Sequence, residues 1–139
     1  MAVRVHTGEF TFGTKKKREL VNITQRVQEE ADRAKMKSGM VLVYAPHATG
    51  SIMIDEDESG LKQDVLDTLW RLIPEEHNYQ HDRIDNNAHS HQKSGIVGCS
   101  KVIPLINGSL GLGTWQSVFF LESDGPRSSR RVTVTVIGE

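Results

Sequence analysis

The order of its apolar segments constrains the fold of this chain more than any other feature. Segments with alternating apolar residues or β-branched content stand at the beginning, in the middle and at the end, and two segments of helical periodicity separate them. A strict alternation of strands and helices would predict a parallel sheet, and this order departs from it. The sequence therefore predicts the α+β fold class, as a single domain over residues 1–139 with two or three helices.

Strands are expected in six segments. In the first, apolar and polar residues alternate from Val3 to Phe12, and we expect one strand or two, broken at Gly8. A short helix followed by a strand is expected within 94–106, and the Asn107–Gly108 pair that comes next is a hairpin turn signal. The remaining strands are expected at 40–45, 50–54, 115–122 and 130–138.

Two amphipathic helices are expected, at 22–39 and 55–74. In the first, Asn22 and Gln25 have the spacing of a capping box, and Gly39 is a suitable stop. In the second, Ser59 is the expected N-cap and Pro74 ends the helix. The expected buried stripe of the second helix consists of Leu61, Val65, Leu69 and Leu72.

Composition excludes several function classes. The net charge is −1 and aromatic residues make up 6% of the chain, which argues against a nucleic-acid-binding module. The only cysteine, Cys99, cannot form an internal disulfide, and the first residues lack the apolar core of a secretory signal, so we expect a cytoplasmic protein. No apolar run approaches the roughly 20 residues of a membrane-spanning helix.

The most unusual local feature is AHSH, in which His89 and His91 flank one serine. On an extended backbone, residues two apart point the same way, about 7 Å from each other, and can converge on one ion. On a helix the same spacing turns them about 200° apart, so they would not converge. We expect an extended or irregular segment here. With His81 and His47, the pair would then form a metal site whose imidazoles favour Zn, Ni or Fe.

These histidines belong to a polar segment, 75–92, which is long for a loop without structure of its own and is therefore expected to serve function. Asp85 lies four residues before His89 and is a candidate catalytic or second-shell carboxylate. Glu56, at the end of a predicted strand, is a candidate base, ligand or ordinary surface residue. If carboxylates dominate the site, Mg²⁺ becomes the expected ion.

Two further segments contain groups that bind phosphate in other proteins. The turn GSLGLGTWQ exposes backbone N–H groups at Gly113 and Thr114, although a plain glycine hairpin explains the same pattern. In DGPRSSRR, Arg127 has the chemistry to hold a phosphate or carboxylate, although a solvated hairpin tip explains it equally. Neither motif identifies a ligand alone.

Taken together, HATGSIMIDEDE, DNNAHSHQKSGIVG, GLGTWQSVFFLESDGPR and RRVTVTVIGE resemble the YjbQ-like family over nearly the whole chain, in the same order. The resemblance implies a mixed β-sandwich core, a homotrimer and weak thiamine-phosphate synthase activity, which joins a pyrimidine pyrophosphate to a thiazole phosphate. Ala48 departs from the family pattern, which often has a hydroxyl residue there. The resemblance maps the family's polar cluster onto His47, Thr49, Glu56, His81, Asp85, Asn86, His89, His91, Trp115 and Gln116.

Two hypotheses follow. In the first, the chain is a transferase of the thiamine-phosphate synthase type, with Glu56, Asp85 and His89 as catalytic groups. In the second, the same pocket binds a metal or a phosphorylated metabolite without turnover. In both, the phosphate-binding candidates are Thr49, Asn86, Gly113, Thr114, Trp115, Gln116 and Arg127.

Overall fold

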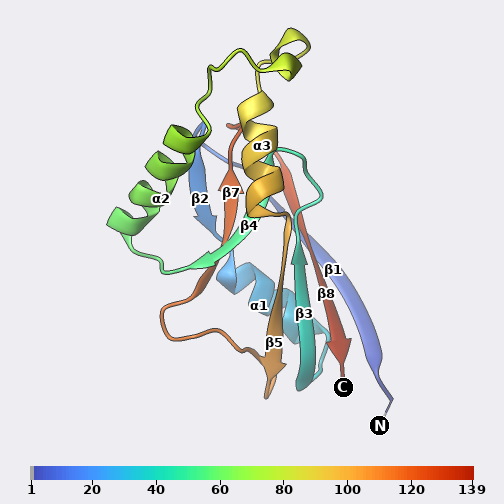
Figure 1. The fold of residues 1–139 in the computed structure, drawn as a ribbon. Coiled ribbons are helices and arrows are strands. Elements are labelled where there is room, and N and C mark those ends of the chain that lie inside the picture. The colour runs from blue at the N-terminus through green and yellow to red at the C-terminus, as the bar shows by residue number, and fades with distance from the viewer. Residues whose placement is uncertain (1) are drawn as a thin grey trace.

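The computed structural model describes residues 2–139, within which the chain forms eight strands, three α-helices and one 3-10 helix (Figure 1). The α+β class is therefore confirmed. The strands are β1 (Arg4–Phe12), β2 (Glu19–Asn22), β3 (Ser38–Tyr44), β4 (Gly50–Asp55), β5 (Ser100–Ile106), β6 (Ser109–Leu110), β7 (Ser117–Glu122) and β8 (Arg130–Gly138). The helices are α1 (Thr24–Arg33), α2 (Ser59–Leu72), the 3-10 helix η1 (Gln80–Arg83) and α3 (Ala88–Val97).

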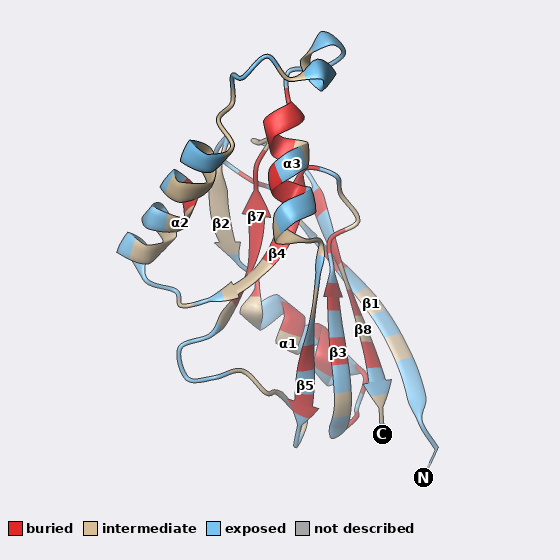
Figure 2. Cartoon of the chain, viewed as in Figure 1, coloured by how far each residue is buried: buried red, intermediate tan, exposed pale blue. Residues whose placement is uncertain are grey.

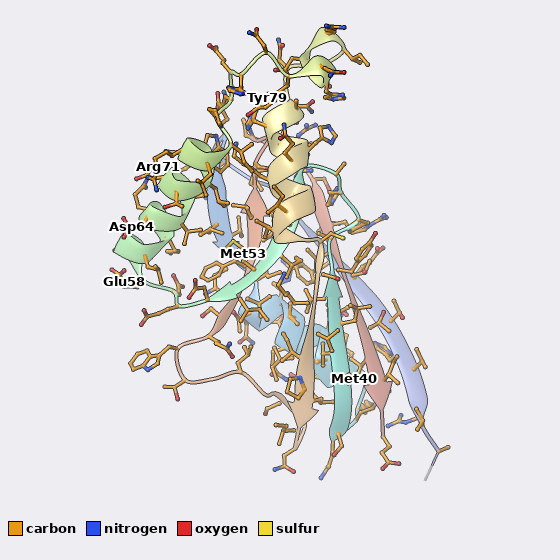
Figure 3. All side chains as sticks on the ribbon, in the orientation of Figure 1. Met40, Met53, Glu58, Asp64, Arg71 and Tyr79 are labelled. Atoms are coloured by element: carbon orange, nitrogen blue, oxygen red, sulfur yellow. The ribbon has the colours of Figure 1, made fainter. Side chains whose placement is uncertain are left out.

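The strands form two antiparallel sheets. The larger has the order β1-β8-β3-β5-β6, and the smaller has the order β2-β7-β4. In β3, Val41 and Val43 face inward while Met40, Leu42 and Tyr44 alternate outward, as a strand with one solvated face requires. Met40 projects from that outer face in Figure 3.

One apolar core fills the space between the inner face of the larger sheet, α1 and the smaller sheet (Figure 2). Val134 of β8, Val27 of α1 and Phe120 of β7 are each completely buried in it. The alternation of β7 turns Phe119 and Leu121 to the opposite side of the smaller sheet, where α2 and α3 lie (Figure 1). The smaller sheet is thus covered on both faces, and the second layer supports the candidate site.

The strand predictions are mostly confirmed, with two differences. β1 runs unbroken through Gly8, where a Cβ would collide with the carboxylate of Glu30, so this glycine permits close approach of α1 and does not break the strand. β2 was not predicted, because its four residues lack a pattern long enough to detect. The hairpin turn is confirmed, since both Asn107 and Gly108 have positive φ between β5 and β6.

The predicted helices are present but shorter. α1 ends at Arg33, and Lys35 with a φ of 52° turns the chain before Gly39 is reached. Asn22 accepts a hydrogen bond from Thr24 N–H at 3.0 Å, and the capping box with Gln25 does not form. In α2 the N-cap is Glu58 rather than Ser59, because its carboxylate accepts from the backbone of Gly60 and Leu61.

The predicted buried stripe of α2 is wrong in part. Leu66 is the residue of this helix that is buried, whereas Leu72 is 70% exposed. Leu61, Val65 and Leu69 are half-buried and line a shallow apolar groove with Met53 of β4. None of the helices in residues 2–139 has the length and apolar content to span a membrane.

The expectation of an extended AHSH segment is wrong. Residues 88–97 form α3, so His89 and His91 project to different sides of a helix. The predicted 75–92 loop is correspondingly shorter, and it contains the turn of η1 before α3 begins. The loop and η1 project beyond the two sheets at one end of the molecule (Figure 1).

Candidate functional site

The candidate site is centred on the inner side of α3, where polar side chains are buried against β4 and the end of β7. His89 and Lys93 lie four residues apart, so both project on the same side of the helix. Both side chains are buried, since His89 is 3% exposed and Lys93 is 0% exposed. The Nζ atom of Lys93 lies 2.6 Å from Nδ1 of His89, which is a short hydrogen bond.

Lys93 has an unusual environment for a lysine. Its amine lies 3.9 Å from the centre of the Trp70 ring, and within residues 2–139 it forms no ion pair with a carboxylate. Burial lowers the pKa of Lys93 from 10.5 to about 8, against the opposing charge of Glu75. Burial, followed by the positive charge of Lys93, also lowers the pKa of His89. Two cations 2.6 Å apart would repel each other, so the pair holds one proton between two nitrogens.

Trp70 links this pair to the surface of the protein. Its indole Nε1 donates to Glu75 at 3.1 Å, and the same carboxylate accepts from Lys17 at 2.7 Å. The hydrogen bond from Lys17 is the main reason that the pKa of Glu75 is lowered. Arg18 also lies over the Trp70 ring, 5.1 Å from its centre. Trp70 is therefore held in place by Glu75 and Arg18, with the Lys93 amine against its ring.

Glu75 and Lys17, the two residues that this network adds to Trp70, also line an open cavity of about 760 Å³. Figure 3 labels Tyr79, which belongs to its lining and lies beside the first turn of α3. The cavity combines the cations Lys17 and Arg83 with several carboxylates, one of which, Glu75, is ion-paired with Lys17 at 2.7 Å. Its lining consists of Lys17, Glu75, Glu76, His77, Asn78, Tyr79, Asp82, Arg83 and Asn86. Asn86 is thus one predicted ligand-binding residue that the structure places at a cavity.

Hydrogen bonds at the start of α3 fix the position of the site relative to β7. Asp82 accepts from the backbone N–H of Ala88 at 3.1 Å. Asn87 donates to Asp124 at 3.0 Å, and Asp124 also forms an ion pair with Arg127 at 2.7 Å. The guanidinium of Arg127 is therefore already bound to a carboxylate, and it lies near the candidate site without a free anion-binding fork.

The predicted four-histidine metal site does not assemble in this chain. The rings of His81 and His91 are 4.8 Å apart at 74°, and they form a pair on the outer side of α3. His89 is bound to Lys93 on the inner side, and His47 accepts from the backbone N–H of Arg131 at 2.9 Å. Within residues 2–139 no three His, Cys, Asp or Glu side chains are arranged to hold a metal ion. His81 and His91 are the two predicted ligands that lie close together, and Nε2 of His81 also lies 3.2 Å from the amide oxygen of Asn87.

His47 lies instead beside a buried ion pair. Burial and the positive charge of Arg130 lower its pKa. Arg130 donates to the carboxylate of Glu122 and to the hydroxyl of Thr49, and Glu122 also accepts from Thr14 at 2.7 Å. Burial raises the pKa of Glu122, but these hydrogen bonds outweigh it and the pKa is lowered. Thr49 is buried and bound to Arg130, so it supports the fold here.

The predicted catalytic carboxylates do not lie beside His89. Ile52 N–H bonds to the carbonyl of Gly98, just beyond the C-terminal end of α3, and Glu56 lies four residues further along the chain. His89 is at the opposite end of that helix. Asp85 is exposed, and its side chain has no hydrogen bond within residues 2–139. Asp85 and His89 are therefore close in the sequence, but their side chains form no hydrogen bond or ion pair with each other.

The glycine-rich turn lies apart from the α3 site, in the loop between β6 and β7 (Figure 1). The backbone N–H of Gly113 donates to the side chain of Gln116 at 2.8 Å, so it is not free for a phosphate. Thr114 is exposed, and Trp115 is 72% exposed at the tip of the loop. Within one chain, these four predicted ligand-binding residues contribute nothing to the cavity.

Sequence reasoning missed Lys93, Trp70, Glu75 and Lys17. The detectable signal was the His-x-x-x-Lys spacing, which places His89 and Lys93 on one face of a helix. That signal has meaning only if the segment is helical. Trp70, Glu75 and Lys17 come from α2 and from segments outside the helices, and no local pattern connects them with α3.

Comparison with known proteins gives a consistent family assignment. The family described as UPF0047 protein YjbQ-like matches residues 8–139. A UPF0047 protein of Archaeoglobus fulgidus is 43% identical over 129 residues, covering 93% of this chain and 99% of the relative. One from Methanothermobacter thermautotrophicus is 41% identical, covering 99% of this chain and 95% of the relative.

Solved structures agree with this assignment. A Sulfolobus solfataricus crystal structure, described as a YbjQ-like protein of unknown function, superposes with a TM-score of 0.97 at 35% identity, covering 99% of this chain and all of that one. A Clostridium acetobutylicum protein of the yjbq/upf0047 family gives a TM-score of 0.87 at 34% identity, covering 92% of this chain and 98% of that one. The architecture and the whole-length sequence similarity together show that this chain belongs to the YjbQ-like UPF0047 family.

Proposed function

We propose that this protein is an enzyme that acts on a small phosphorylated metabolite, with His89 and Lys93 as its acid/base pair. The observation that supports this most strongly is the 2.6 Å contact between a fully buried lysine amine and an imidazole, without a carboxylate partner. Ionisable groups with strongly shifted pKa values gather at functional sites, because catalysis needs groups that exchange protons near neutral pH. Structural stability alone does not require such a pair.

The pair exists in two forms with the same total charge. In one, the ammonium of Lys93 donates to Nδ1 of His89, and the imidazole is neutral with its proton on Nε2. In the other, Nδ1–H of an imidazolium donates to a neutral amine. Because burial lowers the pKa of Lys93 to about 8, its ammonium gives up a proton more readily than an exposed lysine does, and the neutral imidazole beside it can receive that proton.

Phosphate binding is assigned to the cavity next to the pair. Lys17 and Arg83 line it, and both are cations of the kind that bind phosphate oxygens. The reaction to assay first is that of thiamine-phosphate synthase, a transferase reaction that the family resemblance suggests, in which pyrophosphate leaves. Of these two cations, Lys17 is already paired with Glu75, so Arg83, which forms no ion pair within residues 2–139, is the one available to bind such a leaving group. The proposed location is the cytoplasm, a reducing compartment in which a free thiol such as that of Cys99 persists.

The test combines a pyrimidine pyrophosphate and a thiazole phosphate with purified protein and measures the coupled product. The parent and His91→Ala should form product at rates within about twofold of each other, whereas His89→Ala should lose at least about 100-fold. Circular dichroism of each variant checks the fold. Equal loss in both variants, or none in either, would rule out His89 as the acid/base group.

A second candidate function, a binding protein without turnover, is favoured by the His81–His91 pair. Two imidazoles 4.8 Å apart, centre to centre, are suited to share a divalent ion such as Zn, Ni or Fe, while Mg²⁺ would prefer the carboxylates of the neighbouring cavity. Calorimetric titration with Zn²⁺ tests it. Binding that is lost in His91→Ala but kept in His77→Ala supports a metal-binding role, and no heat in the parent contradicts it.

The proposed assembly is a homotrimer formed through the outer face of the larger sheet. That face carries apolar residues on adjacent strands in register, since Leu42 pairs with Val102 and Met40 pairs with Ile137. All four are exposed in the single chain, between 36% and 58%. Contiguous exposed apolar surface of this kind marks interaction sites, and identical copies supply a matching surface.

Light scattering after size exclusion measures the assembly directly. The parent should have three times the mass of the chain, and Leu42→Glu should shift it to one. Thr135→Glu is the control, because Thr135 lies beside Leu42 on the same face and has little apolar surface to lose. It introduces the same charge without removing an apolar side chain, so it should weaken the trimer less than Leu42→Glu does. A parent protein with the mass of one chain would contradict the proposal.

A further inference from the structure

An acid/base role explains why His89 and Lys93 touch but not why the amine of Lys93 faces an aromatic ring. Lys101 provides the comparison within the same chain. Its ammonium donates to three carbonyl oxygens, those of Ile52, Val97 and Ser100, at 2.9–3.4 Å. Lys93 has a ring nitrogen as its one polar partner. Three acceptors suit an ammonium, whereas the Lys93 ammonium has a single nitrogen acceptor and the face of the Trp70 ring, so fewer hydrogen bonds hold its proton.

We propose that Lys93 is a nucleophile that forms an imine with an aldehyde or ketone, and that His89 carries the protons of this reaction. This inference rests on the proposed enzymatic function and names the substrate class of the same site, a carbonyl compound. Thiamine-phosphate synthesis involves no carbonyl group, so that activity would be a side reaction of a site built for carbonyl chemistry. Desolvation in an apolar pocket is a known way of activating a lysine for imine formation.

The steps balance with these two residues. His89 takes a proton from the Lys93 ammonium, and the free amine adds to the carbonyl carbon while one of its own protons moves to the carbonyl oxygen. The resulting hydroxyl group receives a proton from the His89 imidazolium and leaves as water, while the C=N bond forms. Water is the only leaving group, and no oxidant or reductant takes part. Hydrolysis returns the amine by the same steps in reverse.

The route to the amine passes the Trp70 ring. On one side of this ring lies Lys93 Nζ, and the indole Nε1 is bound to Glu75, which lines the cavity. The hydrogen bond between Trp70 and Glu75 therefore joins the ring that covers the amine to the lining of a cavity of about 760 Å³. For a carbonyl compound to reach Nζ from the cavity, the hydrogen bond between Trp70 and Glu75 has to open and the indole ring has to turn away from Lys93. Arg83 at the cavity, which forms no ion pair within residues 2–139, would bind an acidic group on the same substrate.

Reductive trapping tests the imine. The full-length protein is incubated at pH 7 with glyoxylate, a small acidic aldehyde, and cyanoborohydride, which reduces an imine to a stable carboxymethyl-lysine. Digestion and mass spectrometry then give the labelling rate of each lysine. Lys93 should be labelled at least about tenfold faster than Lys62 and Lys101, because more of it is uncharged at this pH. Removing the Trp70 side chain with Trp70→Ala should raise the Lys93 rate further.

The outcomes separate this inference from the proposed function. If Lys93 is labelled no faster than Lys62 in both the parent and Trp70→Ala, the imine is excluded, even if His89→Ala still abolishes synthase turnover. If Lys93 is labelled selectively and no synthase product forms, the imine proposal is supported and the synthase reaction is excluded. Lys93→Arg, which keeps the charge but cannot form the imine, should show no fast-labelled site while keeping its circular dichroism spectrum.

Discussion

The two sides of α3 show opposite ways of treating the same residue type. On the inner side, His89 is buried and bound to a lysine with a lowered pKa. On the outer side, His91 is half-buried and stacks edge-on against His81 beside solvent. The two histidines are separated by a single serine, and that serine is itself buried with its hydroxyl bound to the carbonyl of Ser123.

The contrast shows that burial, rather than residue type, decides the chemistry available to a histidine. On the outer side, water solvates charged groups, and it replaces a protein contact that is lost, so each contact contributes little free energy. On the inner side each polar group depends on its protein partner, because an unpaired buried group costs free energy. Four predictions, from the largest expected effect to the smallest, test this difference.

The largest effect is expected from Arg130, in the buried polar layer beside the inner side of α3. Arg130→Met leaves Glu122 as a buried charge without its partner, and it should lower the free energy of unfolding by about 3–5 kcal/mol. Urea unfolding at pH 7 measures this. Arg127→Met breaks an exposed ion pair with Asp124 and should cost less than about 1 kcal/mol. Equal losses in the two variants would contradict the contrast.

The next effect concerns the dependence of stability on pH. The folded pKa of Lys93 is about 8 and the unfolded value is 10.5, so between these values the unfolded chain binds more protons. The parent should therefore gain stability relative to Lys93→Met as pH rises from about 8 to 10.5, by on the order of 2 kcal/mol. Urea midpoints across this range measure the difference. A constant difference between the two proteins would mean that Lys93 titrates normally.

A smaller effect is expected from the serine that joins α3 to β4. Ser94 is buried and donates to the carbonyl of Gly50 at 2.7 Å, so Ser94→Ala should cost about 1 kcal/mol. Gln92, on the exposed side of the same helix, is the matched control, and Gln92→Ala should stay within about 0.5 kcal/mol of the parent. A loss in Gln92→Ala as large as that in Ser94→Ala would mean that the two sides do not differ.

The smallest effect is expected from His91. Its ring contacts His81 beside solvent, so His91→Ala should change the free energy of unfolding by no more than about 0.5 kcal/mol. His89→Ala, which leaves the Lys93 amine without its hydrogen-bond partner, should cost about 1–3 kcal/mol at pH 7. Thermal and urea unfolding measure the loss of stability in each variant. A larger loss in His91→Ala than in His89→Ala would contradict the difference between the two sides of α3.

The sequence predicted strands far better than it predicted α3. In β8, Val132, Val134 and Val136 alternate with polar residues, and that pattern arises from one buried face and is visible locally. On the inner side of α3 the buried residues include four polar ones, so no apolar periodicity indicates a helix in the sequence. These four residues are His89, Ser90, Lys93 and Ser94. A rule that equates burial with apolar residues therefore interprets this segment as a loop.

The candidate site was predicted in part for the same reason. His89 was identified from its residue type, but its partner Lys93 was not, because the extended interpretation of AHSH removed the four-residue helical spacing. Glu56 and Asp85 were chosen by their nearness in sequence to strand ends or histidines, and the fold carries Glu56 beyond the far end of α3. Trp70 comes from α2, and only the packing of α2 beside α3 reveals its contact with Lys93.

The central claim is that His89 and Lys93 share one proton in a buried site. The most direct test is a pH titration of the Lys93 side chain by NMR, with ¹³C- or ¹⁵N-labelled lysine and Lys93→Arg to assign the signal. The account predicts a titration midpoint near 8, accompanied by a change in the His89 ring signals at the same pH. A Lys93 midpoint near 10.5, with His89 unaffected, would contradict it.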